Sequence, residues 1–219
     1  MRVAALYDVH GNVPALEAVL AEAEAEVVLF GGDLTWGPQP AETLVLARSL
    51  EGAAFVRGNC DREPDDWERS QLSPEEVAFL QGLPERVVLD GVLYCHATPR
   101  SDREVVTPAT PDDALADALA GVAERVVVAG HTHMQQDRRV AGVRFVNAGS
   151  VGMPYEGEVA AFWALVVDGE PELRRTTVDA DRIAAVLRAS AWPRADEVLR
   201  ENVLTPVTRE QAIAELESG

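Results

Sequence analysis

The sequence predicts an α/β fold in which two packed, mixed β-sheets are flanked by helices. Two observations lead to this prediction. Apolar, β-type runs alternate with helical segments in the first part of the chain, which is typical of parallel crossovers. From about residue 86 the apolar runs instead come in pairs around two-residue turns, which is typical of antiparallel hairpins. With 219 residues, 47% of them hydrophobic, the chain is long enough for one substantial core.

The first part of the chain contains three pairs of a strand and a helix. The strands are expected at residues 3–7, 27–30 and 53–56, and the helices that follow them at 11–25, 40–50 and 73–83. Two helix starts carry N-capping patterns, because Asn12 is followed by Pro14, and Ser73 is followed three residues later by a glutamate. A further helix is expected to begin at Thr110 and Pro111. These units predict parallel strands joined by helical crossovers.

Three hairpins are expected in the second part of the chain. Their turns lie at Asp90–Gly91, Ala141–Gly142 and Asp168–Gly169. Three amphipathic helices then follow, at residues 179–189, 193–202 and 208–217. We expect these helices to pack on the body of the protein through their apolar faces rather than to form a separate partner surface. Without a linker, repeat or low-complexity tract, the chain is predicted to be a single domain over residues 1–219.

The composition argues against several classes of function. The formal charge of −18 disfavours binding to long nucleic acids or anionic membranes, so a phosphate group would need a local cation to attract it. All 19 basic residues are arginine, which removes lysine Schiff-base and P-loop chemistry. Two cysteines, Cys60 and Cys95, are too few for a disulfide framework and fit a reducing compartment. No apolar run approaches the ~20 residues that span a bilayer, so the chain is predicted to be soluble and cytoplasmic.

Polar side chains that can bind metals follow five of the predicted strands. They comprise all four histidines of the chain, two aspartates and one asparagine: Asp8, His10, Asp33, Asn59, His96, His131 and His133. In open α/β sheets the carboxyl ends of the strands form the ligand-binding edge, so these side chains are expected to converge. Taken one at a time, each could be a helix cap or a hydrogen-bonded core residue. Their shared position at strand ends favours a common functional site.

The chemistry of these side chains points to divalent metals. Imidazole, carboxylate and amide ligands suit manganese, iron, cobalt, nickel or zinc better than calcium, and manganese is the preferred candidate. The candidate ligands are enough for two ions if one carboxylate, most simply Asp33, bridges them. Two such ions ~4 Å apart can clamp a phosphate and activate a bridging hydroxide that attacks phosphorus. The sequence therefore predicts two divalent ions per chain and a small phosphate-ester substrate.

The order of these residues resembles that of the calcineurin-like metallophosphoesterase family. The resemblance extends from about residue 2 to 152 and rests on these motifs: Asp8-x-His10, Gly32-Asp33, Gly58-Asn59, His96 and Gly130-His131-x-His133. It implies a double-sheet α/β sandwich, with residues 153–219 packed on the core that bears the motifs. It also implies two ligand sets, one made of Asp8, His10, Asp33 and His133, and the other of Asp33, Asn59, His96 and His131. The segment Asn147–Pro154 is similar to a glycine-serine segment of the small bacterial members.

One motif departs from the common pattern of the family. Many members have Gly-Asn-His-Asp, whose histidine is placed to protonate the leaving group, whereas this chain has Cys60 at that position. The variant resembles a subgroup of small bacterial and archaeal phosphodiesterases, and it leaves Asp61 to a structural or water-binding role. The missing proton donor predicts a preference for phosphodiesters with acidic leaving groups. Arg62 follows directly and can either contact a substrate phosphate or neutralise nearby acidic residues.

The function that the resemblance implies is that of a two-metal phosphodiesterase. The metal-bridging hydroxide would attack phosphorus, while Asp33, Asn59 and His96 act in catalysis and Asn59 also helps to bind the phosphate. Two enzymatic alternatives use the same centre, namely a phosphomonoesterase and a nucleotide pyrophosphatase of the diadenosine-tetraphosphate type. A third alternative is a non-enzymatic scaffold, like the retromer subunit that resembles this fold with a degraded metal centre. A homo-oligomer is compatible with the sequence.

Overall fold

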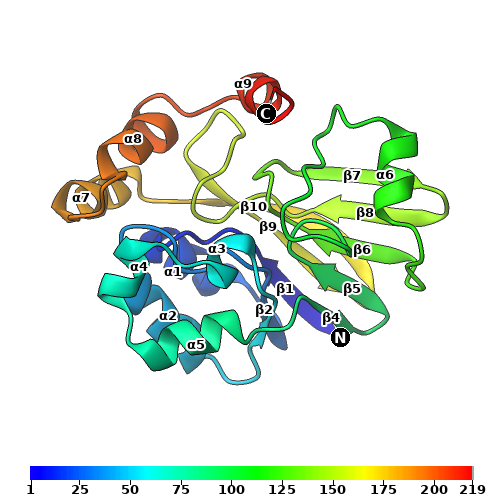
Figure 1. Ribbon diagram of the computed structural model, residues 1–219, viewed down its shortest axis with the longest axis horizontal. Coiled ribbons are helices and arrows are strands. Elements are labelled where there is room, and N and C mark those ends of the chain that lie inside the picture. The colour runs from blue at the N-terminus through cyan, green and yellow to red at the C-terminus, as the bar shows by residue number, and fades with distance from the viewer. Residues whose placement is uncertain (219) are drawn as a thin grey trace.

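The structure of the chain, a computed structural model, describes residues 1–218. Within this range ten strands form two five-stranded sheets, with strand orders β10-β9-β1-β2-β3 and β4-β5-β6-β8-β7. The two sheets lie against each other, and helices pack on their outer faces (Figure 1). Each sheet combines parallel and antiparallel neighbours, which confirms the predicted fold class.

The first sheet contains the three parallel strands of the N-terminal crossovers. Its strands are β1 (Arg2–Leu6), β2 (Val27–Phe30), β3 (Ala54–Phe55), β9 (Ala160–Val167) and β10 (Glu170–Thr177). β1, β2 and β3 run parallel, and β9 runs antiparallel to both β1 and β10. The register sets Ala4 of β1 opposite Val28 on one side and Leu165 on the other. β1 is therefore a central strand, and the loop that follows it lies in the middle of the sheet edge.

The second sheet is formed by the middle of the chain. Its strands are β4 (Arg86–Leu89), β5 (Val92–Cys95), β6 (Val126–Ala129), β7 (Gln136–Val140) and β8 (Val143–Asn147). β5, β6 and β8 run parallel, with β4 and β7 as antiparallel edges. All three predicted hairpins are confirmed, because β4–β5, β7–β8 and β9–β10 pair as expected. The first residues of their turns, Asp90, Ala141 and Asp168, each have a φ of 50°, as two-residue hairpin turns of this type require.

Helices connect the strands and form the C-terminal segment. Within the described residues they are α1 (Val13–Glu22), α2 (Pro40–Ser49), α3 (Asn59–Arg62), α4 (Asp66–Gln71), α5 (Pro74–Gln81), α6 (Asp112–Ala118), α7 (Ala180–Ala189), α8 (Ala195–Leu199), the π-helical turn η1 (Arg200–Leu204) and α9 (Arg209–Leu216). The expected caps of α1 and α5 are confirmed, since the side chains of Asn12 and Ser73 accept hydrogen bonds from backbone N–H groups three residues on. Thr208 caps α9 in the same way. Thr110 does not cap α6, because its hydroxyl accepts a hydrogen bond from the backbone of Thr107 instead.

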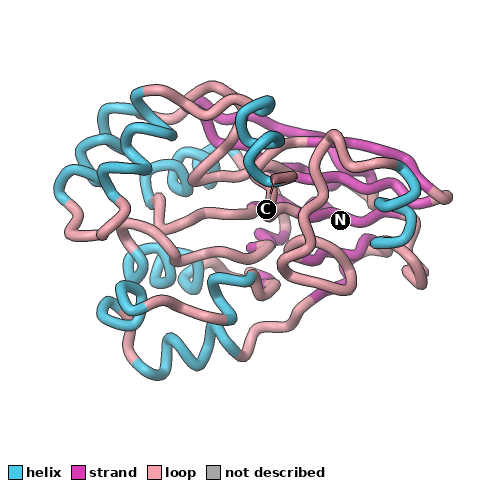
Figure 2. The backbone as a smooth tube through the Cα atoms, turned by 45° about the horizontal axis from the view of Figure 1, so that its top comes forward, coloured by secondary structure: helices cyan, strands magenta, loops and turns pink. Residues whose placement is uncertain are grey.

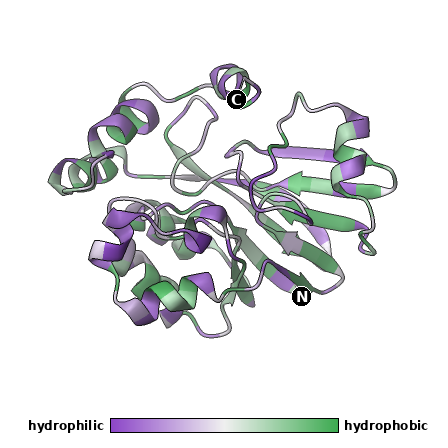
Figure 3. Cartoon of the chain, in the orientation of Figure 1, coloured by the Kyte–Doolittle hydropathy of each residue, from purple (hydrophilic) through white to green (hydrophobic). Residues whose placement is uncertain are grey.

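The apolar core has one layer between the sheets and one layer on each outer face. Along β1 the side chains alternate, so that Val3 and Ala5 face the second sheet while Ala4 and Leu6 face the helices. The Tyr7 hydroxyl donates a hydrogen bond of 2.8 Å to the carbonyl of Val128 on β6 and so ties the two sheets together. In Figure 3 hydrophobic colours dominate the inner strands, such as β5, β6 and β8, whereas the edge strand β7 is mostly hydrophilic. Figure 2 shows most helices on the side of the first sheet, while α6 covers the second.

Two of the C-terminal helices, α7 and α8, pack on the helical side of the first sheet. Ile183 and Leu187 of α7 and Val198 of α8 belong to the same buried apolar cluster as Leu16 of α1. This packing brings the C-terminal segment close to the loop after β1. No helix among residues 1–218 is both long and apolar enough to cross a membrane.

Candidate metal centre

The predicted ligands lie in the loops that follow five parallel strands. These strands are β1 and β2 and β3 of the first sheet, and β5 and β6 of the second. Hydrogen bonds join loops of different strands. The backbone N–H of His131 donates to the Asp8 carboxylate over 2.8 Å, and the N–H of Gly130 donates to the His96 carbonyl over 2.8 Å. The structure therefore brings the loops of both sheets together at one edge, as the sequence predicts.

The first cluster of ligand atoms comes from the loops after β1 and β6. It consists of Asp8, His10 and His133, whose ligand atoms all lie within 4.8 Å of one another. The Nε2 atom of His133 is 3.4 Å from Oδ1 of Asp8, and Nε2 of His10 is 3.8 Å from the same oxygen. The two Nε2 atoms are only 3.1 Å apart. All three residues are buried, so their polar atoms face one another rather than bulk water.

The second cluster adjoins the first and comes from the loops after β2, β5 and β6, the last of which it shares with the first cluster. It consists of Asp33, His96 and His131, whose ligand atoms also lie within 4.8 Å of one another. Nε2 of His96 is 3.5 Å from Oδ1 of Asp33 and 3.2 Å from Oδ1 of Asn59. The same nitrogen is 3.9 Å from Oδ1 of Asp8, which belongs to the first cluster. The seven predicted ligands thus form two neighbouring groups, as the proposed pair of metal sites requires.

Backbone carbonyl groups orient three of the histidine rings. Nδ1 of His10 lies 3.1 Å from the Trp36 carbonyl, and Nδ1 of His133 lies 2.7 Å from the Met153 carbonyl. Nδ1 of His96 lies 3.0 Å from the carbonyl of Gly31. A carbonyl can only accept, so each Nδ1 carries a proton, and in the neutral form of the ring the lone pair of Nε2 points toward the centre. This outer hydrogen bond is the usual way in which a metal-binding histidine is held.

Five of the predicted ligands have left-handed backbone conformations. They are Asp8, His10, Asp33, His131 and His133, with φ between 49° and 69°. Outside these five, the non-glycine residues with positive φ in the described chain are the first residues of the three hairpin turns. Left-handed conformations are uncommon for non-glycine residues and concentrate at functional sites, where the surrounding fold enforces them. The sharp turns at the strand ends therefore aim these side chains at one point.

At three places in the centre, polar atoms lack a suitable hydrogen-bond partner, which indicates that the centre is built for cations. Oδ1 of Asp8 is buried and has no hydrogen-bond partner. Two lone pairs face each other where Nε2 of His10 approaches Nε2 of His133. Oδ1 of Asn59 faces ring nitrogens, and hydrogen bonding alone would favour the reverse orientation, in which the amide nitrogen donates to His96 and His131. A cation between these atoms satisfies all three contacts, so the donor set fits divalent metals of the kind that imidazole and oxygen ligands prefer.

The electrostatics of the centre keep most ligands in a metal-binding protonation state. Burial would raise the pKa of Asp33, but nearby imidazoles, His96 foremost, hold that pKa well below its ordinary value. Burial, followed by repulsion from a neighbouring histidine, lowers the pKa of His10 and of His131 to about 4. Burial also acts to lower the pKa of His96, but Asp33 outweighs it and raises this pKa to about 10. A metal at His96 would therefore displace a proton, whereas His10 and His131 are neutral ligands at pH 7.

Asp61 organises the loops after β2 and β3. Its buried carboxylate accepts hydrogen bonds from the backbone N–H groups of Asp33 at 2.8 Å, Gly58 at 2.8 Å and Leu34 at 3.1 Å. Burial, and then the charge of Asp33, raise the pKa of Asp61 to about 6. The sequence left two roles open for Asp61, a structural one and water binding. These contacts give it the structural role.

Cys60 lies next to the second cluster but has the properties of an inert thiol. Its backbone N–H donates to Oδ1 of Asp33 over 2.9 Å. Burial, followed by the negative charge of Asp33, raises the pKa of the thiol far above its ordinary value. Such a thiol is a poor nucleophile and a poor proton donor at neutral pH. Cys60 therefore does not replace the proton-donating histidine of the Gly-Asn-His-Asp motif that this chain resembles.

Arg62 lies in the wall of a polar cavity beside His96. The cavity has a volume of about 300 Å³ and is also lined by Thr98 and Ser101. The guanidinium binds Asp102 through Nε at 2.6 Å and Nη2 at 3.2 Å, and Nη1 lies 2.5 Å from the Glu63 carboxylate. Arg62 thus neutralises nearby acidic residues, which was one of its two predicted roles. Its contact with a substrate phosphate stays a prediction.

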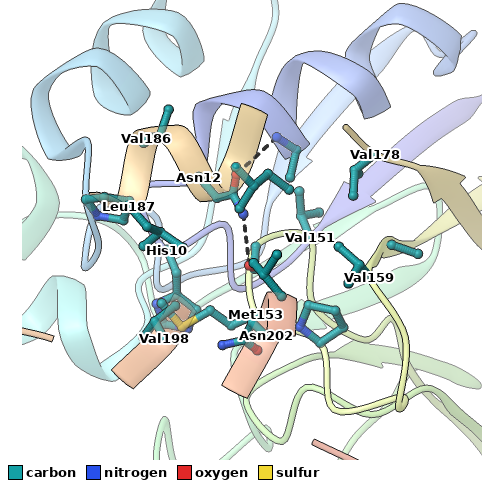
Figure 4. A pocket seen from close by; sticks show the side chains of 17 residues that line it. His10, Asn12, Val151, Met153, Val159, Val178, Val186, Leu187, Val198 and Asn202 are labelled. Carbon is teal, nitrogen blue, oxygen red and sulfur yellow. Dashed lines mark hydrogen bonds between the residues drawn. The ribbon is translucent and has the colours of Figure 1, made fainter. Parts of the chain in front are cut away.

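A second, apolar crevice lies next to His10 (Figure 4). It lies between α1, α7, the η1 turn and the segment 151–154. The centre therefore borders a polar cavity at the second cluster and an apolar crevice at the first.

Several residues that shape the centre were not apparent from the sequence. The Ser150 hydroxyl donates to the Asp8 carbonyl over 2.8 Å and accepts from the Met153 N–H over 2.8 Å. Asn147 donates to the Gly130 carbonyl over 2.6 Å and so supports the turn that carries His131. Both lie in the glycine-serine segment Asn147–Pro154, which begins at the last residue of β8, and its composition was the only local signal. Their contacts join positions far apart in the chain, which local patterns do not reveal.

Residues 1–170 match the sequence model of the calcineurin-like phosphoesterase superfamily domain. Among solved structures, the chain is similar to a metallophosphoesterase from Sphaerobacter thermophilus, with a TM-score of 0.77 and 24% identity over 91% of this chain and 97% of that one. It is also similar to a hypothetical protein from Pyrococcus horikoshii OT3, with a TM-score of 0.79 and 20% identity over 91% of this chain and 96% of that one. At these identities the likenesses show the fold. No curated protein matches the chain.

Proposed function

The chain belongs to the calcineurin-like phosphoesterase superfamily, and from that premise we propose that it is a two-metal phosphodiesterase. The family depends on divalent metals, and the chain has two candidate clusters of ligands for them. The observation that carries the proposal is the contact between these clusters, in which Nε2 of His96 lies 3.9 Å from Oδ1 of Asp8. Ligands this close can hold two ions that act on one phosphate.

The proposed division of ligands assigns a distinct task to each part of the centre. Asp8, His10 and His133 would hold one ion, His96, His131 and Asn59 the other, and Asp33 would bridge them. When bound, the ions would polarise the phosphate and lower the pKa of a coordinated water, which supplies the nucleophile. His96 lines the polar cavity and Asn59 lies 3.2 Å from its Nε2, so both are placed to orient the phosphate oxygens. Burial of the cluster excludes bulk water and strengthens these polar contacts.

The leaving group that fits this centre is an acidic one. Cys60 stands where many relatives have a proton-donating histidine, and burial, which raises the pKa of the thiol, makes it a weak general acid at neutral pH. Loss of a general acid typically slows the expulsion of a basic leaving group by about 100- to 10,000-fold. Phenolates and other stable anions leave without that assistance, so aryl phosphodiesters are the preferred test substrates.

The alternatives to a phosphodiesterase find less support in the surroundings of the centre. A nucleotide pyrophosphatase would need free cationic groups for the additional phosphates. The arginines of the polar cavity, Arg62 and Arg100, are both paired with carboxylates. A non-enzymatic scaffold would not require metal-binding side chains at all seven positions. Nor would it require the left-handed backbone turns that direct five of these side chains toward the centre. Manganese as the native metal, a cytoplasmic location and a homo-oligomeric state stay predictions.

Hydrolysis of bis(p-nitrophenyl) phosphate tests the proposed function. Protein stripped with a chelator is expected to be inactive, and addition of manganese should restore release of p-nitrophenolate with two ions bound per chain. Asp33→Asn should lower the restored rate by about 100- to 1,000-fold, because it removes a charge from the site of both ions. Asp113→Asn is the matched control, since Asp113 is an exposed carboxylate in the first turn of α6.

The two readouts separate the alternatives. Two bound ions without turnover of the diester would overturn the phosphodiesterase in favour of a monoester or anhydride substrate, which p-nitrophenyl phosphate and diadenosine tetraphosphate would then identify. Failure to bind ions at all would support a scaffold.

A further inference from the structure

The C-terminal helix α9 is held mainly by polar contacts at its two ends. Figure 1 shows α9 set apart from α7 and α8, which pack on the first sheet. Of the residues of α9, Arg209–Leu216, only Ala212 is buried, so the helix has little apolar core of its own. The contacts at both ends lead to the loop after β6, which carries the proposed ligands His131 and His133.

Arg209, the first residue of α9, binds this loop at Gln135. Its Nη2 donates to the Gln135 carbonyl over 2.8 Å, and its Nη1 lies 2.8 Å from the Glu156 carboxylate. That carboxylate is 9% exposed and accepts a hydrogen bond of 2.6 Å from the Gln135 N–H. The two partners of the ion pair therefore bind both polar groups of the Gln135 backbone, two residues after His133. Because of these added contacts the pair fixes the loop, which an ordinary surface ion pair would not do.

The segment that contains Glu156 also holds the ring of His133. Tyr155 stacks on this ring with 4.8 Å between the ring centroids, and its backbone N–H donates to the His133 carbonyl over 3.1 Å. The Met153 carbonyl lies 2.7 Å from Nδ1 of the same ring. Residues 153–155 thus fix both the ring and the backbone of His133, and Glu156 connects them to Arg209. A shift of Glu156 would move Nε2 of His133, the atom that faces the first ion.

The other end of α9 reaches the loop after β5. The Thr107 hydroxyl donates to the Glu217 carboxylate over 2.6 Å. The carbonyl of the preceding residue, Val106, accepts a hydrogen bond of 3.2 Å from the Thr132 hydroxyl, and Thr132 lies between the two histidines of the ligand loop. α9 is therefore tied at both ends to residues that hold this loop.

The contacts of α9 act on the first ion more than on the second. The other ligand of the loop, His131, has separate supports, since its N–H donates to the Asp8 carboxylate and Asn147 binds the carbonyl of Gly130 before it. His133, in contrast, depends on the segment that Arg209 holds through Glu156.

We propose that Arg209 is a positioning residue for the first ion, and that docking of α9 is coupled to metal binding there. This inference rests on the metal centre of the proposed function and adds a means by which that centre is regulated. Contacts that orient a metal ligand from outside typically change metal affinity by about 10- to 100-fold. Coupling is reciprocal, so the ion should hold α9 in place by the same factor by which α9 strengthens the binding of the ion. A helix with one buried side chain can respond in this way, because such segments open locally at low cost.

Manganese titration of Arg209→Met tests the proposal. Methionine keeps most of the aliphatic stem and removes the guanidinium. Calorimetry should show that one of the two manganese-binding steps is weakened about tenfold. In a His10→Ala background, which disables the first site, Arg209→Met should leave the remaining step unchanged. Arg182→Met is the matched control, because Arg182 forms an ion pair of 2.7 Å with Glu17 on the surface, and its loss should change neither step.

Hydrogen exchange of the α9 amides gives a second readout that does not depend on turnover. In the wild type, manganese should slow this exchange about tenfold relative to protein in chelator, because ion binding and docking are coupled. In Arg209→Met the same amides should exchange faster and respond much less to manganese. A contact that only stabilised α9 would change the exchange rate without making it depend on the metal.

The outcomes separate this proposal from the proposed function. Wild-type affinity at both steps in Arg209→Met, or equal weakening of both, would overturn the positioning role. So would exchange of the wild-type α9 amides that does not respond to manganese. If the wild type binds two ions but does not hydrolyse bis(p-nitrophenyl) phosphate, the phosphodiesterase fails, and the metal measurements still decide the role of Arg209. A wild type that binds no manganese would overturn both proposals.

Discussion

Glu68→Gln should make the protein more stable at alkaline pH. Glu68 is fully buried at the start of α4, where it accepts hydrogen bonds from the Thr35 hydroxyl at 2.8 Å and the Asp65 N–H at 3.1 Å. Burial raises the pKa of its carboxyl to about 8, from a value of 4.5 in an exposed chain. Glutamine keeps the shape and can serve both contacts without ever being ionised.

The sign of the effect follows from proton uptake on folding. Below pH 4.5 the carboxyl is protonated in both states, and Glu68 costs the folded state nothing. Between pH 4.5 and 8 the unfolded chain loses this proton while the folded chain keeps it, so the free energy of unfolding falls as pH rises. The raised pKa corresponds to a loss of at most about 5 kcal/mol, which is complete above pH 8. Glu68→Gln should recover most of this loss.

Urea unfolding at pH 5.0, 6.5 and 8.5, with a chelator present throughout, measures the effect. The stability of Glu68→Gln relative to the wild type should rise steadily over this range, toward several kcal/mol at pH 8.5. Glu76→Gln is the matched control, because Glu76 occupies the same capping position in α5 but is partly exposed. Its bonds to Ser73 lower the pKa of Glu76, so this variant should lose a little stability at neutral pH. Parallel pH curves for Glu68→Gln and the wild type would refute the assigned protonation.

Three further substitutions probe the centre and its support. Gly58→Ala would place a Cβ atom 2.2 Å from Oδ1 of Asp33, and we expect turnover to fall about 100-fold as the carboxylate moves, with the metal content as a second measurement. Cys60→His should raise kcat mainly for alkyl phosphodiesters by restoring a proton donor, and an equal change for aryl esters would contradict this explanation. Tyr7→Phe removes the hydroxyl contact between the two sheets and should lower the free energy of unfolding by about 1 kcal/mol, with metal binding unchanged.

Much of the fold could be predicted because its signals are local. The strand β2 is a four-residue apolar run bounded by polar and glycine residues. The dipeptide Asp90–Gly91 is strongly preferred in two-residue hairpin turns and rarely found in helices or strands. The convergence of the candidate ligands could be predicted for a related reason, since each lies in a loop that follows such a strand. The rule that ligands bind at the carboxyl ends of strands then places them together without knowledge of any long-range contact.

The remaining features depend on contacts between distant parts of the chain. Arg62 pairs with its neighbour Glu63, which local sequence could suggest, but also with Asp102, 40 residues away, which it could not. Asn202 was expected within a regular amphipathic helix at 193–202, but the segment breaks into α8 and η1. Periodicity locates the apolar face of a helix, but it does not show a change to π-helical bonding or the crevice that the turn closes.

The left-handed ligands should make the centre a source of strain that metal binding offsets. His131 has a φ of 69°, a conformation in which a side chain costs about 1 to 2 kcal/mol. His131→Gly and His131→Ala both remove the imidazole, but only glycine also relieves the backbone. In the presence of a chelator, His131→Gly should therefore be about 1 kcal/mol more stable than His131→Ala, although glycine is the less favourable residue in most other positions. Both variants should lose much of the stabilisation that manganese gives the wild type, because they share the loss of one ligand. If alanine were as stable as glycine at this position, the turn would not be strained, and the left-handed conformations could not be counted as evidence for a built site.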